Sequence, residues 1–464
     1  MNWRGHAVGL LAIAGLCAGM WMVFDSITSS TQPAVKKSRS QAGKQWRNGV
    51  RVAVVWPQRL EGASKFNPSA SRLPWLANRL PHGPLAAAFI RLRELPLPSY
   101  PEGLQVALNI LREQEILQNL TPLAARIELD RYYEPSFPRA DDAVSVARQV
   151  AGDESVVAVV GHYSSPSAIA ASLVYEKHQI LFISPTATIP ELTKRAFFYT
   201  FRLTPDDADL ALTIAMFAKH RGYAKVGVLY PRTEQGESLQ KRLTAAARAI
   251  GIEVAFKKSY FGDSAEWDDM DDYRPLAAKV RLYNVEAFLV ADELPRAAKL
   301  LMDLRSMQLM QPILGSDYMD SPSLIQLAGV AAKDVYVTSA VNPDTKTAAY
   351  IAFKERFLKE FGVLPSYAAS QGFETMQLLY TGIRRAGSAD PLALANRFRT
   401  DHSWPSMFDP FRFNNDGAIE CRNISVKVTE VEQMRFSSLV TSGPEGIRLP
   451  FRYEPKGSSL TACP

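Results

Sequence analysis

The sequence predicts an α/β protein with two lobes, each built on a doubly wound parallel sheet. Short apolar runs such as Val156–Val160 and Ile180–Ile183 alternate with helical patterns over most of the chain. Such runs are typical of parallel strands covered on both faces, and repeated strand–helix units place helices on both sides of a sheet. The 464 residues also exceed the usual size of one domain, roughly 100 to 200 residues. We therefore expect two separate cores.

Two neighbouring predicted strands end in clusters of small hydroxyl residues. Val156–Val160 is followed by Ser164 and Ser165, either of which can cap the next helix. Ile180–Ile183 runs into the sequence Ser-Pro-Thr-Ala-Thr at 184–188. Open α/β sheets bind ligands beyond the carboxyl ends of their strands, and a helix N-terminus there favours an anion. The pattern predicts a site for one small polar ligand.

These segments carry a family resemblance. GHYSSPSAIAAS at 161–172 and ILFISPTATIPELT at 180–193 resemble the first lobe of the type I periplasmic binding proteins, in the branch of leucine/isoleucine/valine receptors of ABC importers. Phe201–Asp207 resembles the family's first crossing between lobes, and Lys225–Tyr230 resembles the first strand of its second lobe. The resemblance extends from about Val50 to Val428. It implies two periplasmic-binding-protein-like lobes joined by a three-segment hinge, with crossings near Leu203, Val341 and Arg412.

The resemblance sets the expected boundaries of the two lobes, and the composition of the N-terminal 49 residues, which the resemblance does not explain, sets those of the segments before them. The chain divides into a signal or transmembrane anchor at 1–24, a flexible tether at 25–49, a first lobe at 50–202 plus about 342–412, and a second lobe with tail at 203–341 plus about 413–464. A proline-rich insert at 58–99 separates the first strand from the first long helix. This insert has no counterpart in the family, and packing over a lobe or contact with a partner are both open.

The N-terminal run Ala7–Phe24 is uncharged. As a helix it would cross most of a hydrocarbon core of about 30 Å, so we expect an export signal or an uncleaved anchor. The positive-inside rule favours a cytoplasmic domain, because the run is followed by Lys36, Lys37, Arg39, Lys44 and Arg47. The family resemblance favours the outside face, and we expect a periplasmic or extracytoplasmic protein, either anchored to the cytoplasmic membrane or secreted.

Charge and motif content exclude several classes of function. The net charge of +6 comes from basic residues interleaved with 47 acids, which indicates a mixed solvated surface and no nucleic-acid partner. No P-loop, dinucleotide fingerprint, nucleophile elbow or metal-ligand cluster occurs, so we predict no enzyme activity, cofactor or metal. In an oxidising compartment Cys421 and Cys463 could form a disulfide, and two free thiols are the alternative.

In the first lobe, the resemblance implies that Ser165, Thr186 and Thr188 bind the α-carboxylate and α-ammonium groups of a ligand, with Tyr163 and Ser164 beside them. Hydroxyls can donate to a carboxylate or accept from an ammonium group. The alternative is that the loop hydroxyls satisfy backbone groups at a turn. We assign the adjacent histidine, at 162, to structural support.

In the second lobe, the resemblance places Asp317 as the counter-charge for a ligand ammonium group. The family's aromatic contact falls on Glu293, and an acidic second wall suits a more polar or cationic ligand. A solvent-facing loop is the alternative for Glu293. We expect a receptor that captures an amino acid or amino-acid-like compound for ABC-type import, with a permease as its partner. A membrane-tethered sensor and an envelope interaction protein are the alternatives.

Overall fold

The computed structural model describes residues 49–57, 100–135, 140–260, 274–294, 296–342, 344–420, 423–433 and 435–438. The apolar run at 7–24, the insert at 58–99, and the cysteines at 17, 421 and 463 lie outside these residues. Among the helices that are described, none is both long enough and apolar enough to span a membrane.

The first lobe contains a five-stranded, fully parallel sheet in the order β2-β1-β3-β4-β5. Its strands are β1 (Val50–Pro57), β2 (Ile127–Glu134), β3 (Val156–Gly161), β4 (Leu181–Ser184) and β5 (Thr200–Arg202). All residues of β3 and β4 are buried, as the continuous apolar runs predict. This lobe confirms the predicted parallel sheet.

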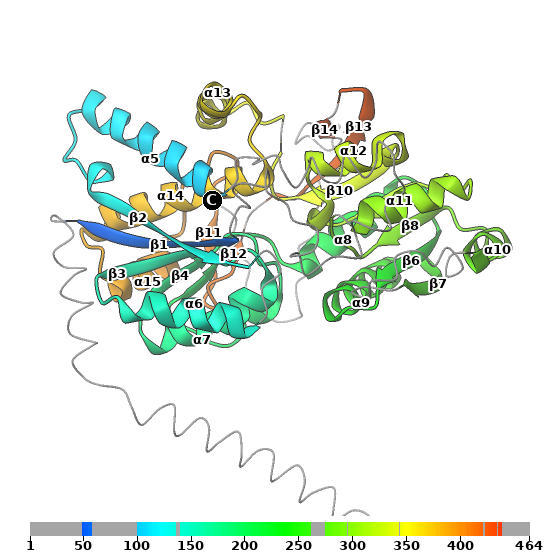
Figure 1. Cartoon of the computed structure of the whole chain (residues 1–464), viewed down its shortest axis with the longest axis horizontal. Helices are drawn as coiled ribbons and strands as arrows, with labels where there is room; N and C mark the ends of the chain where they lie inside the picture. The colour runs from blue at the N-terminus through cyan, green and yellow to red at the C-terminus, as the bar shows by residue number, and fades with distance from the viewer. Residues whose placement is uncertain are drawn as a thin grey trace, which may run out of the picture.

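Helices cover both faces of the first sheet (Figure 1). Along β1, Val52 and Val54 join one apolar core while Ala53 and Val55 join another, because successive side chains of a strand point to opposite faces. The first core is completed by α5 (Tyr100–Leu117), α13 (Ala348–Phe361), α14 (Tyr367–Ala386) and α15 (Pro391–Thr400), and the second by α6 (Ala140–Gly152) and α7 (Ser165–Lys177).

The second lobe contains a seven-stranded sheet in the order β14-β13-β10-β9-β8-β6-β7. The strands are β6 (Lys225–Pro231), β7 (Glu253–Tyr260), β8 (Ala287–Val290), β9 (Ile313–Gly315), β10 (Val335–Ser339), β13 (Ser425–Glu430) and β14 (Arg435–Ser438). β6 to β10 pair in parallel, whereas β13 is antiparallel to β10 and to β14. The predicted parallel sheet is present in β6 to β10, and the C-terminal strands β13 and β14 extend it with antiparallel pairing at this edge.

Helices also cover both faces of the second sheet. One apolar core is formed with α8 (Asp207–His220) and α9 (Glu234–Ala249), and the other with α10 (Arg274–Tyr283), α11 (Arg296–Ser306) and α12 (Pro322–Ala328). This arrangement matches the alternation of strands and helices predicted from the sequence.

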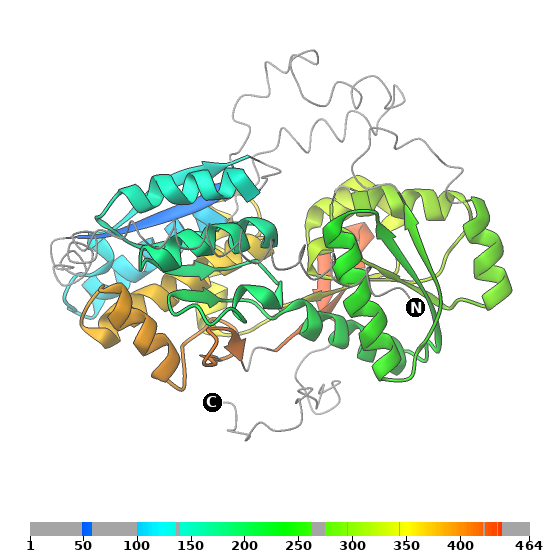
Figure 2. The same ribbon diagram turned by 90° about the horizontal axis from the view of Figure 1, so that it is seen from below.

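Within the part of the chain that the structure describes, the backbone passes between the lobes three times (Figure 2). Leu203 still packs in the first lobe's core, immediately before α8, and Val341 rejoins that core shortly after β10. These two crossings lie where the sequence predicts them. The third does not lie near Arg412: Ile419 still packs in the first lobe's core, and β13 of the second lobe begins at Ser425. β11 (Arg412–Phe413) and β12 (Ile419–Glu420) form a small hairpin that extends the first lobe.

Helices α5 and α14 approach each other backbone to backbone. A Cβ atom on Gly103 would lie 1.9 Å from the Ala369 carbonyl oxygen, and one on Gly372 would lie 2.3 Å from the Tyr100 carbonyl oxygen. Tyr100 begins the described chain after the insert and is fully buried. The two glycines therefore allow the first long helix to pack against the first lobe.

We expect Gly103→Ala to lower the free energy of unfolding by about 1 to 3 kcal/mol, because the methyl group overpacks the α5–α14 contact. Gly152→Ala is the matched control, since no atom lies within 4 Å of a Cβ there and alanine is the better helix residue. Urea unfolding of both variants measures the difference. Equal free energies of unfolding for the two variants would show that α5 and α14 accommodate the added methyl group without loss of stability.

Candidate functional site

Loops at the carboxyl ends of β4 and β9 meet between the lobes. Thr188 follows β4, and Tyr318 lies in the 3-10 turn Asp317–Met319 that follows β9. The Thr188 Oγ1 atom and the Tyr318 hydroxyl oxygen are 2.8 Å apart, which is hydrogen-bond distance. The sequence predicts Thr188 and Asp317 on facing walls, and the structure brings their loops together.

The two candidate cap residues of α7 have different roles. Ser164 is the N-cap: its hydroxyl oxygen accepts the Ser167 backbone N–H at 3.3 Å, and its hydroxyl donates to Ser167 Oγ at 2.9 Å. Ser165 is buried, and its hydroxyl has no hydrogen-bond partner among the described residues. Burial raises the pKa of the Tyr318 phenol well above its ordinary range, and Ser165 lies close enough to oppose part of that rise. Ser165 therefore offers a free hydroxyl at the junction.

Thr186 satisfies a backbone group, which is the alternative considered for this loop. Its hydroxyl donates to the Tyr163 carbonyl oxygen at 2.9 Å, and so ties the β3 and β4 loops together. The Tyr163 ring contacts the Trp56 ring edge-on, with 5.4 Å between ring centroids, and Trp56 stacks on Tyr100. Trp56 is not among the predicted site residues, although its place at the carboxyl end of the first strand is a usable signal.

His162 supports the turn after β3. Its Nδ1 atom bonds the Glu134 carboxylate and its Nε2 atom lies 2.8 Å from the Tyr175 hydroxyl, with all three residues buried. Its backbone has φ of +53°, and the preceding Gly161 has φ of +137°, where a Cβ would lie 2.0 Å from the Val55 carbonyl oxygen. The structural role predicted for His162 is confirmed.

Two carboxylates at the junction each have one buried oxygen without a partner in the described part of the chain. These oxygens are Oδ1 of Asp317 and Oδ1 of Asp207, the first residue of α8. Burial raises the pKa of Asp317 well above its ordinary range, and the charges of Asp207 and Asp320 add to this effect. Burial likewise raises the pKa of Asp207. Asp207 is not among the predicted site residues, although it lies in the segment predicted to form the first crossing between the lobes.

Glu293 lies beside the junction, in the loop before α11, and also contacts the first residue of that helix. Its carboxylate is 3.5 Å from the Arg296 guanidinium, and 34% of its side-chain surface is exposed. Tyr163 is 46% exposed overall, yet desolvation, followed by the charges of Glu293 and Asp317, raises the pKa of its phenol to about 12. Glu293 therefore lies close enough to the first lobe for its charge to act on the Tyr163 phenol.

A buried ion pair supports the turn that carries Asp317 and Tyr318. The Lys427 ammonium group on β13 lies 2.8 Å and 3.0 Å from the two carboxylate oxygens of Asp320, and both residues are buried. The Asp320 backbone N–H donates to the Asp317 carbonyl oxygen at 2.9 Å. The late antiparallel strand thus fixes the second wall of the site.

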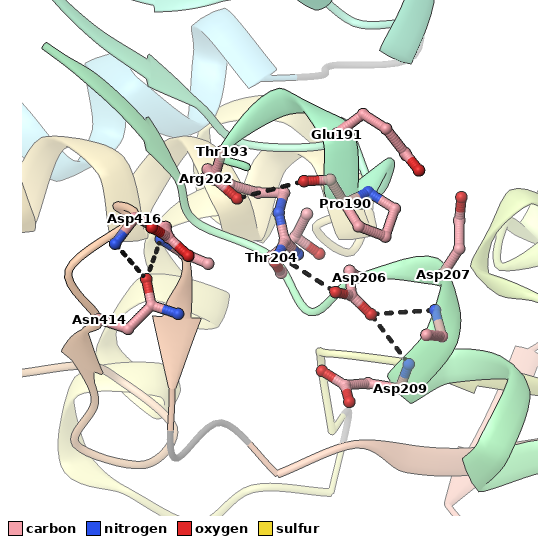
Figure 3. Close-up of polar contacts among 12 residues, drawn as sticks. Pro190, Glu191, Thr193, Arg202, Thr204, Asp206, Asp207, Asp209, Asn414 and Asp416 are labelled. Atoms are coloured by element: carbon pink, nitrogen blue, oxygen red, sulfur yellow. Dashed lines mark hydrogen bonds and ion pairs between the residues drawn. The ribbon is translucent and has the colours of Figure 1, made fainter. Parts of the chain in front are cut away.

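The first crossing is tied to the β4 loop by one buried amide. Gln371 Nε2, on α14, donates to the Pro185 carbonyl oxygen at 2.6 Å and to the Leu203 carbonyl oxygen at 3.1 Å. Further along the crossing, Arg202 donates to the Thr204 carbonyl oxygen at 2.7 Å and pairs with Asp206, the N-cap of α8 (Figure 3). Hydrogen bonds therefore connect the first crossing to the loop after β4 that carries Thr186 and Thr188.

Two α/β lobes, three crossings and a polar junction without a catalytic constellation among the described residues define a ligand-binding protein. A model of the periplasmic binding protein family matches residues 139–432. The chain belongs to this extracytoplasmic, non-enzymatic family, and the predicted likeness to the leucine/isoleucine/valine-binding branch is confirmed.

Comparison with known proteins agrees with the fold. The chain is 29% identical over 266 residues to the leucine-, isoleucine-, valine-, threonine- and alanine-binding protein of Pseudomonas aeruginosa, covering 56% of this chain and 68% of that protein. An ABC transporter substrate-binding protein of Desulfitobacterium hafniense in complex with Leu superposes with a TM-score of 0.67 and a sequence identity of 20%. The match covers 84% of this chain and 100% of that protein. A solute-binding protein of R. palustris in complex with benzoate superposes with a TM-score of 0.63 and a sequence identity of 17%. The match covers 84% of this chain and 95% of that protein.

We expect Lys427→Met to destabilise the second lobe by about 3 to 5 kcal/mol, because it leaves the Asp320 carboxylate buried without its cation. The double variant Lys427→Met with Asp320→Leu is the matched control, since removing both charges should restore most of the loss. Urea unfolding measures both. A double variant that is less stable than the single one would contradict this account of the pair.

Proposed function

We propose that this protein is an extracytoplasmic receptor that captures an amino acid or an amino-acid-like compound between its lobes for ABC-type import. The observation that carries the proposal is the set of buried, unpartnered polar atoms at the junction: Ser165 Oγ, Asp207 Oδ1 and Asp317 Oδ1. A buried polar atom without a partner costs about 1 to 3 kcal/mol, so a ligand that satisfies these atoms gains binding free energy.

In this proposal the first lobe holds the ligand carboxylate. Ser165 and Thr188 donate hydroxyl hydrogen bonds, Thr186 keeps the loop in place, and Ser164 and Tyr163 shape the pocket wall. The relatives support this assignment, because leucine and benzoate share one group, a carboxylate. Neither ligand is thereby assigned to this chain.

The second lobe holds the ligand ammonium group. Asp317 is the direct counter-charge, and Glu293 adds negative potential from beside it. Because the two binding walls belong to different lobes, ligand binding favours the closed arrangement over an open one, and the hinge converts binding into closure. A permease that reads the closed form is the proposed partner, and the run at 7–24 is the proposed membrane anchor.

A ligand screen tests the proposal directly. Purified full-length protein is heated with amino acids, amides, polyamines and small carboxylates. We expect at least one amino acid or close analogue to raise the unfolding midpoint, because a ligand at 100 times its dissociation constant adds about 2.7 kcal/mol of stability. The absence of any stabilising compound would favour an interaction protein with a degenerate site, and stabilisation by amines alone would contradict the carboxylate subsite.

Asp317→Asn should weaken binding of the best amine-bearing compound by about 1.5 to 3 kcal/mol, because it removes a charge-assisted hydrogen bond. The ligand ammonium lowers the raised pKa of Asp317, so binding releases a proton. Affinity should therefore rise with pH up to the pKa of Asp317 in the free protein and then level off. The pKa of Asp207 is raised as well, so this carboxylate contributes to the pH dependence of the affinity in the same direction.

Calorimetry in buffers of different ionisation enthalpy measures the affinity and the released proton together. Glu128→Gln, which neutralises an exposed acid on β2, is the control and should bind like the unmutated protein. A folded Asp317→Asn variant with unchanged affinity and unchanged proton release would rule out the counter-charge role.

A further inference from the structure

The Tyr318 phenol lies where the polar groups of the two lobes converge. Its hydroxyl is 2.8 Å from the Thr188 hydroxyl of the first lobe and is within reach of Ser165. The carboxylates of Asp207 and Asp317 act on the same phenol. These are the hydroxyls and carboxylates that a bound amino acid would use in the proposed site. A side chain of the protein therefore already stands among the ligand-binding groups.

The second lobe holds this phenol in place. The Tyr318 ring packs against the apolar core formed with α8 and α9, and the next residue, Met319, is fully buried. The ion pair between Lys427 and Asp320 anchors the other end of the turn. The apolar core holds the ring and the ion pair holds the turn. The hydroxyl therefore faces Thr188 as part of the second lobe's wall.

The lobes share a second polar contact, an exposed ion pair that holds them together less strongly than the Tyr318 hydrogen bond. Arg242 on α9 pairs with Glu191 of the first lobe at 3.0 Å, but 54% of the Glu191 side chain is exposed. Exposed ion pairs contribute little and are screened by salt. The Tyr318 hydrogen bond involves a fully buried threonine and a partly buried phenol, so water competes with it less.

We propose that Tyr318 is an internal latch. Its hydroxyl takes the place of a ligand head group on Thr188, holds the lobes together in the ligand-free protein, and must be displaced when a ligand binds. A ligand carboxylate that bonds the first lobe's hydroxyls replaces the contacts that the phenol loses.

The latch is a property of the ligand-free protein, and its effect on affinity is the part that rests on the proposed function. Removing one hydrogen bond of ordinary net strength shifts the closed-to-open ratio by about 2- to 12-fold. Because the ligand no longer competes with the phenol, its dissociation constant should fall by a similar factor.

Small-angle X-ray scattering of the ligand-free full-length protein tests the latch without any ligand. Tyr318→Phe keeps the ring and removes the hydroxyl, and Thr188→Val removes its partner at equal size. We expect both variants to have a larger radius of gyration than the unmutated protein, and the double variant to be no larger than either. Tyr133→Phe, which removes an exposed phenol hydroxyl on β2, is the matched control and should change nothing.

Calorimetry with L-leucine as the probe tests the competition. Tyr318→Phe should bind L-leucine about 2- to 12-fold more tightly than the unmutated protein, and Tyr133→Phe should not. Identical scattering from Tyr318→Phe, Thr188→Val and the unmutated protein would overturn the latch, and an unchanged or weaker affinity in Tyr318→Phe would overturn the competition. If L-leucine binds neither protein, the amino-acid part of the proposed function fails, and the scattering result alone decides the latch.

Discussion

The structure depends on one constraint, which is that the carboxyl ends of both parallel sheets face the junction of the lobes. A parallel sheet collects the loops that follow its strands at a single edge. The loops after β3 and β4 supply Ser165 and Thr188 from one lobe, and the loop after β9 supplies Asp317 and Tyr318 from the other. A hydrogen bond between residues 130 positions apart follows from this arrangement.

The junction is held by buried polar groups that belong to the scaffold. Gln371 joins the β4 loop to the first crossing, His162 fixes the turn after β3, and Lys427 neutralises Asp320 behind the second wall. The Gln371 Nε2 atom, the His162 ring and the Lys427 ammonium group each have specific partners. The carboxylates of Asp317 and Asp207 combine an unpartnered oxygen with a raised pKa. Perturbed, incompletely satisfied acids of this kind are typical of functional sites.

The latch changes how ligand affinity is understood in this protein. An empty two-lobed receptor is expected to open because nothing bridges its walls. Here the Tyr318 hydroxyl bridges them, and ligand affinity becomes a difference between the ligand's bonds and those of the phenol. Every ligand that takes the phenol's place on Thr188 breaks the same hydrogen bond, so the latch lowers the affinity of all such ligands by a similar factor.

Much of the fold could be predicted because its signals are local. Continuous apolar runs identify β3 and β4, helical spacing identifies α5, and the hydroxyls that end two strands mark the first wall of the site. The first two crossings also follow from the alternation of strands and helices. In each case the residues that carry the signal are neighbours in the chain.

The tertiary structure alone decided the rest, because the deciding partners are distant in sequence. β13 joins the sheet antiparallel to β10, and that pairing moves the third crossing beyond Ile419 and brings Lys427 under the second wall. Thr186 bonds a carbonyl group of another loop, and Tyr318 reaches Thr188 across the junction. The sequence determined which residue types lie at the strand ends, but only the packing of the lobes determined which of them are left free for a ligand.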